Sequence, residues 1–202
     1  MGNRSRVRIF LAGASGVLGS RIVPLLIGDG HDVAAMTRSA EKVEALRALG
    51  AEPVLCDVFD ASKLRAEVAA YGPEMVMHQV TDLPDELDQL GDYGARNDRM
   101  RTEGTRNLIS AAQAAGANRI LAQSIAWRPP GRAEAVEGLE RQVIEANGVI
   151  LRYGQLYGPG TFYEERVPAH PRIHVDEAAR ATVRHLNSSP GILVLAENTE
   201  SV

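Results

Sequence analysis

Three glycines near the start of the sequence have the spacing of a phosphate-binding loop. The segment Gly13-Ala14-Ser15-Gly16-Val17-Leu18-Gly19 follows a short apolar run and opens a helical pattern. In this setting Gly13 permits a tight turn, Gly16 lets the backbone approach a pyrophosphate, and Gly19 lets helix and strand pack closely. The helix start adds N–H groups and the positive end of a dipole. All seven residues are therefore expected to bind a dinucleotide.

The end of the second expected strand distinguishes NADP from NAD. An acid there binds the ribose 2′-hydroxyl of NAD, whereas an arginine accommodates a 2′-phosphate. The sequence reads Met36-Thr37-Arg38-Ser39, with no acid. A guanidinium and a hydroxyl suit phosphate, so we expect NADP, with NAD as the alternative, bound by Thr37, Arg38 and Ser39. The competing interpretation is a solvated Arg38 and a Ser39 that caps the next helix.

Strand-like and helix-like segments alternate along the chain, and each of the first three expected helices ends at or near a glycine. This alternation predicts an α/β fold, a Rossmann-like doubly wound parallel sheet of about seven strands with helices on both faces. Pro24 should kink the first helix or shift its start. The unpatterned stretch 153–173 is expected at the mouth of a site. Strands are expected at 7–12, 32–36, 52–55, 75–79, 119–123, 149–152 and 192–195, and helices at about 18–28, 40–49, 61–71, 95–115, 133–147 and 176–187.

Composition bounds the class of protein. The chain has 202 residues, 45% of them hydrophobic and 24% charged, which predicts one globular domain. Together with the glycine loop, this makes residues 1–202 a single expected NAD(P)-binding domain. A net charge of −4 argues against nucleic acid or an anionic membrane as a partner. The lone Cys56 cannot form an internal disulfide, and neither a signal peptide nor a membrane-length apolar run is evident. We therefore expect a cytoplasmic protein.

Several motifs make the chain resemble the extended short-chain dehydrogenase/reductase superfamily, in its NAD-dependent epimerase/dehydratase branch. The motifs are the glycine loop, Asp57-Val58, the segment 103–108, Ser124, Leu151-Arg152 with Tyr157-Gly158-Pro159-Gly160, and the segment 174–180. Asp57 should lie by the adenine or, as the alternative, form a turn. The resemblance implies a nicotinamide near the ends of the fourth to sixth strands. Cofactor contacts are then expected from Asp57, Val58, Gln79, Val80, Thr81, Ser124, Tyr153 and Leu156.

The chain departs from this family where its proton-transfer residues should be. Catalytic members carry Tyr-x-x-x-Lys after the serine strand, where the lysine lowers the pKa of the tyrosine. Residues 128–140 contain neither residue, and no lysine follows Lys63. The usual mechanism is excluded, which places the chain among atypical members. The remaining catalytic candidates are Ser124, Tyr157, Asn97 and Arg101. Tyr163 lies in the same expected loop as Tyr157, and His78 lies at the end of the fourth expected strand. Each of these residues also has a purely structural interpretation.

The expected function is that of an oxidoreductase with a small substrate. Only about 20 residues separate Arg152 from Ile173, so the C-terminal substrate region should be reduced. Walls from 81–84, 127–131 and 157–163 would suit a compact carbonyl, enone or quinone. The alternatives are a non-catalytic sensor that resembles NmrA-type regulators and an epimerase or isomerase that retains its cofactor. A homodimer is one alternative for the assembly.

No metal site is expected. His170 and His174 are four residues apart, but Pro171 interrupts any helix between them and no third ligand is evident. Asp176 is instead expected to cap the last helix.

Overall fold

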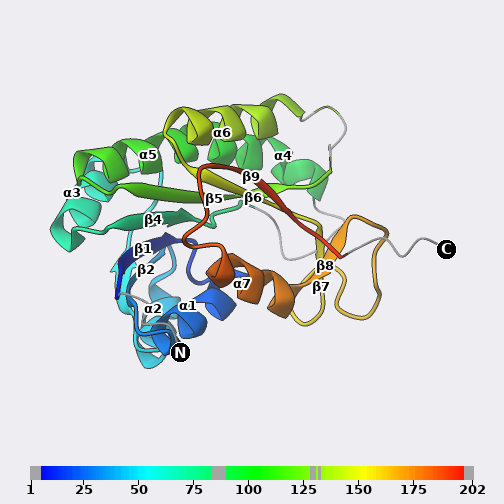
Figure 1. Cartoon of the computed structure of the whole chain (residues 1–202), viewed down its shortest axis with the longest axis horizontal. Helices are drawn as coiled ribbons and strands as arrows, with labels where there is room; N and C mark the ends of the chain where they lie inside the picture. The colour runs from blue at the N-terminus through cyan, green and yellow to red at the C-terminus, as the bar shows by residue number, and fades with distance from the viewer. Residues whose placement is uncertain (1–5, 83–89, 128–130, 132, 198–202) are drawn as a thin grey trace.

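The computed structural model describes residues 6–82, 90–127, 131 and 133–197, and at 90–93 only the backbone. Seven parallel strands form one sheet in the order β3-β2-β1-β4-β5-β6-β9, across the middle of the molecule in Figure 1. The order steps outward from β1 in both directions, as in a doubly wound Rossmann sheet. The expected fold class is therefore confirmed. The strands are β1 (Arg8–Ala12), β2 (Asp32–Thr37), β3 (Glu52–Leu55), β4 (Met75–His78), β5 (Arg119–Ile125), β6 (Val149–Tyr153) and β9 (Gly191–Leu195).

Helices cover both faces of this sheet (Figure 1). Side chains of a strand alternate between the faces, so Ile9 and Leu11 enter one buried cluster while Phe10 and Ala12 enter the other. The first cluster packs beneath α1, α2 and α7, and the second beneath α3, α5 and α6. The helices are α1 (Gly19–Gly28), a 3-10 turn (Ala40–Lys42) leading into α2 (Val43–Ala48), α3 (Ala61–Tyr71), α4 (Leu90–Arg99), α5 (Thr105–Ala114), α6 (Ala133–Glu145) and α7 (Val175–Arg184).

The single helix expected at 95–115 is interrupted. A π-helical segment, Met100–Gly104, separates α4 from α5. A Cβ on Gly104 would lie 2.9 Å from the Met100 sulfur and 3.4 Å from Val58 Cγ1, so the glycine permits close packing at this turn. One wider turn leaves no trace in the hydrophobic period, which explains why the sequence does not reveal it.

Of the two effects expected of Pro24, a shift in the start of the first helix does not occur. α1 begins at Gly19 and continues through Pro24. A proline there removes the hydrogen bond to the Ser20 carbonyl, but both residues are exposed, and water can solvate that oxygen.

The stretch 153–173 contains two strands that the sequence pattern misses. β7 (Gln155–Tyr157) and β8 (Arg172–His174) form a separate two-stranded parallel sheet. Three residues are too few for a readable alternation. The cap expected from Asp176 is also wrong: His174 is the N-cap of α7, and its Nδ1 accepts the Asp176 N–H at 3.3 Å.

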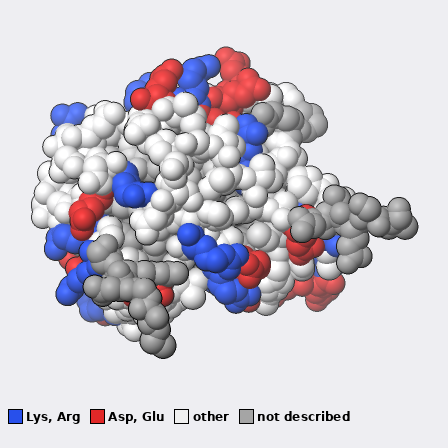
Figure 2. All heavy atoms as spheres, in the orientation of Figure 1, with Lys and Arg blue, Asp and Glu red and all other residues white. Residues whose placement is uncertain are grey.

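Charges of both signs are mixed on the face drawn in Figure 2. Basic and acidic side chains gather together over α6 and over α7. On α7, Glu177 pairs with both Arg180 and Arg184. No large patch of one sign lies among the described residues of this face. Within the described part of the chain, no helix is long and apolar enough to cross a membrane.

Candidate functional site

A cleft lies at the carboxyl ends of β1 to β4, where open α/β sheets bind ligands. Ten of its lining residues were expected as cofactor contacts. The structure therefore brings the glycine loop together with residues that follow β2, β3 and β4. These are Gly13, Ser15, Gly16, Thr37, Arg38, Asp57, Val58, Gln79, Val80 and Thr81. Four further lining residues were missed: Met36, Lys42, Cys56 and Met100.

The glycines have different roles in shaping this cleft. Gly13 has a φ of +86°, and a Cβ there would lie 2.5 Å from the Gln79 carbonyl oxygen. A Cβ on Gly19 would lie 2.1 Å from the Gly13 oxygen. These two glycines are therefore needed for the loop to fold, as the close-packing argument expects. At Gly16 a Cβ would contact only the Gly13 oxygen, at 3.4 Å, which leaves the space in front of the helix open to a ligand.

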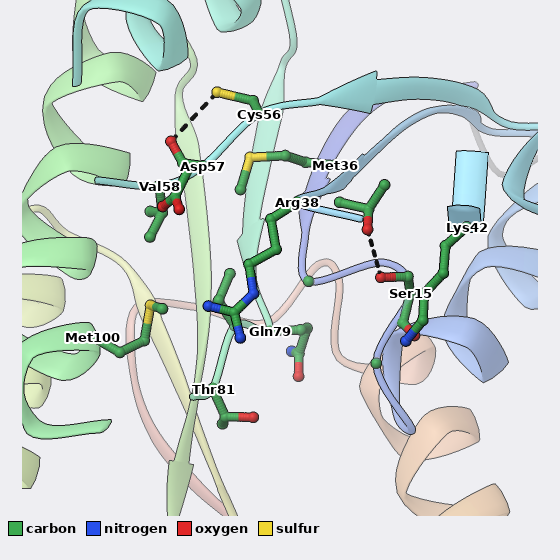
Figure 3. Close-up of a pocket in the computed structure, with 14 residues that line it drawn as sticks. Ser15, Met36, Arg38, Lys42, Cys56, Asp57, Val58, Gln79, Thr81 and Met100 are labelled. Atoms are coloured by element: carbon green, nitrogen blue, oxygen red, sulfur yellow. Dashed lines mark hydrogen bonds between the residues drawn. The ribbon is translucent and has the colours of Figure 1, made fainter. Parts of the chain in front are cut away.

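Basic side chains reach into the cleft from the end of β2 (Figure 3). Arg38 extends across it toward Thr81, and Lys42 extends toward the glycine loop, where its Nζ donates to the Ser15 carbonyl at 3.4 Å. Thr37 supports this rim, since its Oγ1 lies 2.8 Å from Ser15 Oγ and accepts the Ser39 N–H at 3.1 Å. The only sequence signal for Lys42 is its place one turn after Arg38, at the start of a helix.

The cleft fits a dinucleotide in two respects. The Gln79 side chain lines it, is buried and lies close to Tyr153, but neither its amide oxygen nor its nitrogen makes a hydrogen bond of normal geometry within the described residues. Such a buried orphan calls for a polar partner from a ligand. Val58 and Met100 offer apolar contact for a base at the other end. Beside them, burial raises the pKa of the Cys56 thiol to about 11, so Cys56 is a small buried hydrophobe there, not a nucleophile.

The remaining expected cofactor contacts do not line the cleft. Ala14, Leu18 and Gly19 are buried in the packing beneath the loop. Tyr153 is buried too, and its hydroxyl lies 2.6 Å from Thr182 Oγ1; burial raises its pKa well above the ordinary range. The full set outside the lining is Ala14, Val17, Leu18, Gly19, Ser39, Ser124, Tyr153 and Leu156.

Ser124, the first catalytic candidate, is engaged inside the protein. Its hydroxyl donates to Glu140 Oε1 at 2.6 Å. Arg152 also binds Glu140, with Nε 2.8 Å from Oε1 and Nη2 2.6 Å from Oε2. Because the Ser124 proton already has a buried carboxylate as acceptor, the arrangement favours a structural role over donation to a substrate.

The other three candidates are also paired. Asn97 is buried, and its Oδ1 accepts the Asp82 N–H at 3.1 Å. Arg101 Nη1 lies 3.5 Å from Asp98 Oδ1. The Tyr157 hydroxyl donates to Glu197 Oε1 at 2.5 Å, and this bond raises the pKa of the phenol because the carboxylate accepts its proton. None of the three lines the cleft.

The walls expected for a substrate pocket are present only in part. Thr81 lines the cleft, whereas Trp127 and the segment 157–163 do not. Leu83, Pro84 and residues 128–130 lie outside the described residues. Among the residues that are described, no three His, Cys, Asp or Glu side chains form a metal-binding group.

His78 gives a prediction about pH. It is buried at the end of β4, with Nδ1 accepting the Val80 N–H at 3.2 Å and Nε2 3.0 Å from Thr105 Oγ1. Burial lowers its pKa from 6.5 to about 4. Below pH 6.5, His78 therefore binds a proton in the unfolded chain but not in the folded chain. Its contribution to the free energy of unfolding is fully present above pH 6.5 and is lost as the pH falls toward 4.

Lowering the pH from 7 to 5 should thus reduce the free energy of unfolding by about 2 kcal/mol through this residue. Urea unfolding measured at both pH values checks it. His78→Gln, which cannot titrate, should have a smaller difference between the two pH values by that amount. An equal pH dependence in the variant would contradict the assignment.

Comparison with known proteins supplies a family for this geometry. A family model described as NAD(P)H-binding matches residues 13–143, from the glycine loop into α6. The chain is 39% identical over 183 residues to a "3-diazoavenalumate denitrifying reductase" of a Streptomyces species, a match that covers 78% of this chain and 59% of that protein. It is 28% identical over 116 residues to a "3-beta-hydroxysteroid dehydrogenase" of Mycolicibacterium neoaurum, covering 56% of this chain and 31% of that protein. The chain therefore spans less than two thirds of the length of either relative.

Solved structures agree on the fold. A UDP-glucose 4-epimerase of Thermus thermophilus, solved with NAD, superposes with a TM-score of 0.78 at 18% identity, over 95% of this chain and 78% of the epimerase. The corresponding epimerase of Thermotoga maritima, solved with UDP-glucose, gives 0.76 at 17% identity, over 94% and 76%. The expected likeness to epimerase/dehydratase enzymes is confirmed at the level of fold.

Proposed function

The chain belongs to the NAD(P)H-binding family, and from that premise we propose that it is an NADP(H)-dependent reductase of small electrophiles. The observation that carries the proposal is the cleft at the glycine loop, with Arg38 and Lys42 as cations at its rim and an unsatisfied Gln79 amide within it. A dinucleotide with an additional phosphate would meet all three groups. The curated relatives, named as reductases or dehydrogenases, favour redox chemistry over a purely structural use of the fold.

The choice of NADP rests on charge at the end of β2. No acid in Met36-Thr37-Arg38-Ser39 is available to the ribose 2′-hydroxyl of NAD. Arg38 and Lys42 both line the cleft, and two cations in one cleft favour a ligand with an additional, doubly charged phosphate. Gly13, Ser15 and Gly16 would hold the pyrophosphate, and Asp57 and Val58 would flank the adenine.

The missing proton donors narrow the class of substrate. No tyrosine or lysine occurs between Ser124 and Asn147. The hydroxyls of Ser124 and Tyr157 already donate hydrogen bonds to Glu140 and Glu197. A substrate reduced here should therefore need no acid from the protein.

Quinones and enones meet this requirement better than simple ketones. Bound NADPH supplies a hydride when the substrate lies beside it. A quinone that gains a hydride becomes a hydroquinone monoanion, a phenolate whose conjugate acid has a pKa of about 10, like tyrosine, so that water can protonate it. A simple ketone would yield a far more basic alkoxide. In a diazonium ion the carbon–nitrogen bond breaks, dinitrogen leaves and the hydride completes a carbon–hydrogen bond, with no further proton needed.

The relative named a denitrifying reductase fits this reasoning, so we include small arenediazonium ions with quinones and enones as substrates to test. The protein would bind the cofactor at the glycine loop and leave protonation of the product to water. Its own acids and bases would then serve mainly to hold the fold.

NADPH oxidation followed by absorbance tests the proposal with a quinone, an enone, an arenediazonium salt and a simple ketone of similar size. We expect turnover of at least one of the first three and none of the ketone. Rapid ketone reduction would contradict the substrate class. Tight NADPH binding without turnover of any compound would instead overturn the reductase and favour a dinucleotide sensor, whereas failure to bind NADPH would overturn the cofactor assignment.

A further inference from the structure

A buried carboxylate at the rim of the cleft is shared by two arginines. Asp82, just after β4, has a side chain only 4% exposed. Arg38 Nη2 donates to its Oδ1 at 3.0 Å, while Arg96 of α4 donates from Nε to Oδ2 at 3.1 Å and from Nη2 to Oδ1 at 3.2 Å. Both arginine side chains are about half exposed, at 54% for Arg38 and 52% for Arg96.

The two arginines bind Asp82 unequally. Arg96 places two nitrogens on two carboxylate oxygens, the paired geometry that gives the strongest arginine–carboxylate contact. Arg38 contributes one hydrogen bond, and its side chain extends across the cleft toward Thr81 (Figure 3). The Asp82 N–H is fixed separately, by Asn97 Oδ1. Asp82 therefore keeps its place and one complete ion pair without Arg38.

This inequality has an energetic consequence. A buried carboxylate that loses its last cation is strongly destabilised. With Arg96 in place, Arg38 can leave Asp82 for a ligand phosphate, and Asp82 stays neutralised. Without Arg96, Arg38 would be the last cation described on Asp82, and any phosphate would compete with a buried charge for it.

We infer that Arg96 is a positioning residue for the 2′-phosphate of NADP: by neutralising Asp82 it leaves Arg38 available to bind that phosphate. The inference rests on the proposed function, since it takes Arg38 as the 2′-phosphate ligand. It assigns no contact between Arg96 and the cofactor. Arg96 would thus increase the preference for NADP over NAD, although it is 58 positions from Arg38 in the sequence and does not line the cleft.

Adenosine 2′,5′-bisphosphate and 5′-AMP are the probes, because they differ only in the 2′-phosphate. Calorimetric titration of the whole chain should show tighter binding of the bisphosphate. Arg96→Ala should weaken the bisphosphate by about tenfold, a usual coupling within one salt-bridge network, and leave 5′-AMP unchanged. Arg99→Ala is the matched control, because Arg99 lies on the same helix with similar exposure but pairs with Glu103; it should bind both probes as the parent does.

The decisive variant is Asp82→Asn combined with Arg96→Ala. With no carboxylate to hold Arg38, the double variant should recover bisphosphate affinity to within about threefold of the parent. Arg96→Lys keeps the charge without the paired geometry, so its affinity for the bisphosphate should lie between those of the parent and Arg96→Ala. This variant replaces Arg96→Ala in the experiment if the alanine variant does not fold.

The outcomes separate the inference from its premise. If the parent binds the two probes equally, the 2′-phosphate assignment of the proposed function fails. If the parent prefers the bisphosphate and Arg96→Ala, or Arg96→Lys in its place, keeps the full preference, the inference alone fails. It also fails if the double variant remains as weak as Arg96→Ala, because Arg96 would then act by some route other than Asp82.

Discussion

Replacing Arg38 with alanine is expected to raise the Kd for NADPH by about thirtyfold, which corresponds to about 2 kcal/mol for charge-assisted hydrogen bonds to a phosphate. The Kd for NADH should change far less, since NADH lacks the 2′-phosphate that the guanidinium is proposed to bind. Arg38 lines the cleft and is half exposed, so its loss leaves no cavity in the core. Asp82 keeps its pair with Arg96, so the free energy of unfolding should change little.

Nicotinamide fluorescence on titration of NADPH and NADH measures both constants. Arg47→Ala is the matched control, because Arg47 is similarly exposed on α2, pairs with Glu44 and does not line the cleft. It should leave both constants as they are in the parent. Equal weakening of NADPH and NADH by Arg38→Ala would contradict the assignment, since it would place the guanidinium on a part of the ligand that both share.

Much of the fold could be predicted because its signals are local. Each central strand is a short apolar run buried on both faces. The helices α1, α2, α3 and α5 are each followed within two residues by a glycine with a positive φ, which permits the turn. The expected bounds of Glu52–Leu55 and Ala61–Tyr71 agree with the structure. The π segment at Met100–Gly104 and the strands β7 and β8 could not be predicted in this way, because each is set by packing over only three to five residues.

In the cleft, too, some features could be predicted from the sequence and others could not. Gly13 and Gly16 are recognisable for different reasons: Gly13 has a positive φ and no room for a Cβ, whereas Gly16 leaves the space in front of the helix open. The partners of polar side chains are not recognisable, because they depend on contacts across long sequence separations. Nothing in the sequence pairs Arg38 with Asp82. A sequence motif therefore predicts where a residue lies in the fold. Which chemistry that residue can perform depends on its hydrogen-bond partner, and the motif does not reveal this partner.

Ser124 illustrates the point and leads to the second large effect. Glu140, on α6, binds both the Ser124 hydroxyl on β5 and the Arg152 guanidinium on β6. Its side chain is 7% exposed and that of Arg152 24%, and the hydrogen bond with Glu140 raises the pKa of Arg152. This contact joins a helix to two adjacent strands across one face of the sheet.

Glu140→Ala should reduce the free energy of unfolding by about 3 kcal/mol, because Arg152 loses its partner while remaining largely buried. Ser124→Ala removes one neutral donor and should cost about 1 kcal/mol. Urea unfolding followed by circular dichroism measures both. If the loss comes from the uncompensated charge, Glu140→Leu combined with Arg152→Met should recover most of the stability, since an apolar pair can replace a buried ion pair.

The same variants decide what Ser124 does. A structural serine predicts that Ser124→Ala reduces kcat no more than its small loss of stability explains, once a substrate is found. Loss of a proton donor is expected to lower kcat by about a hundredfold. A fall of that size with unchanged NADPH affinity would contradict the structural assignment and show that Ser124 acts on the reacting atoms. Destabilisation by Glu140→Ala equal to that by Ser124→Ala would show that Arg152 is solvated, and the ion pair would then have no part in joining α6 to the sheet.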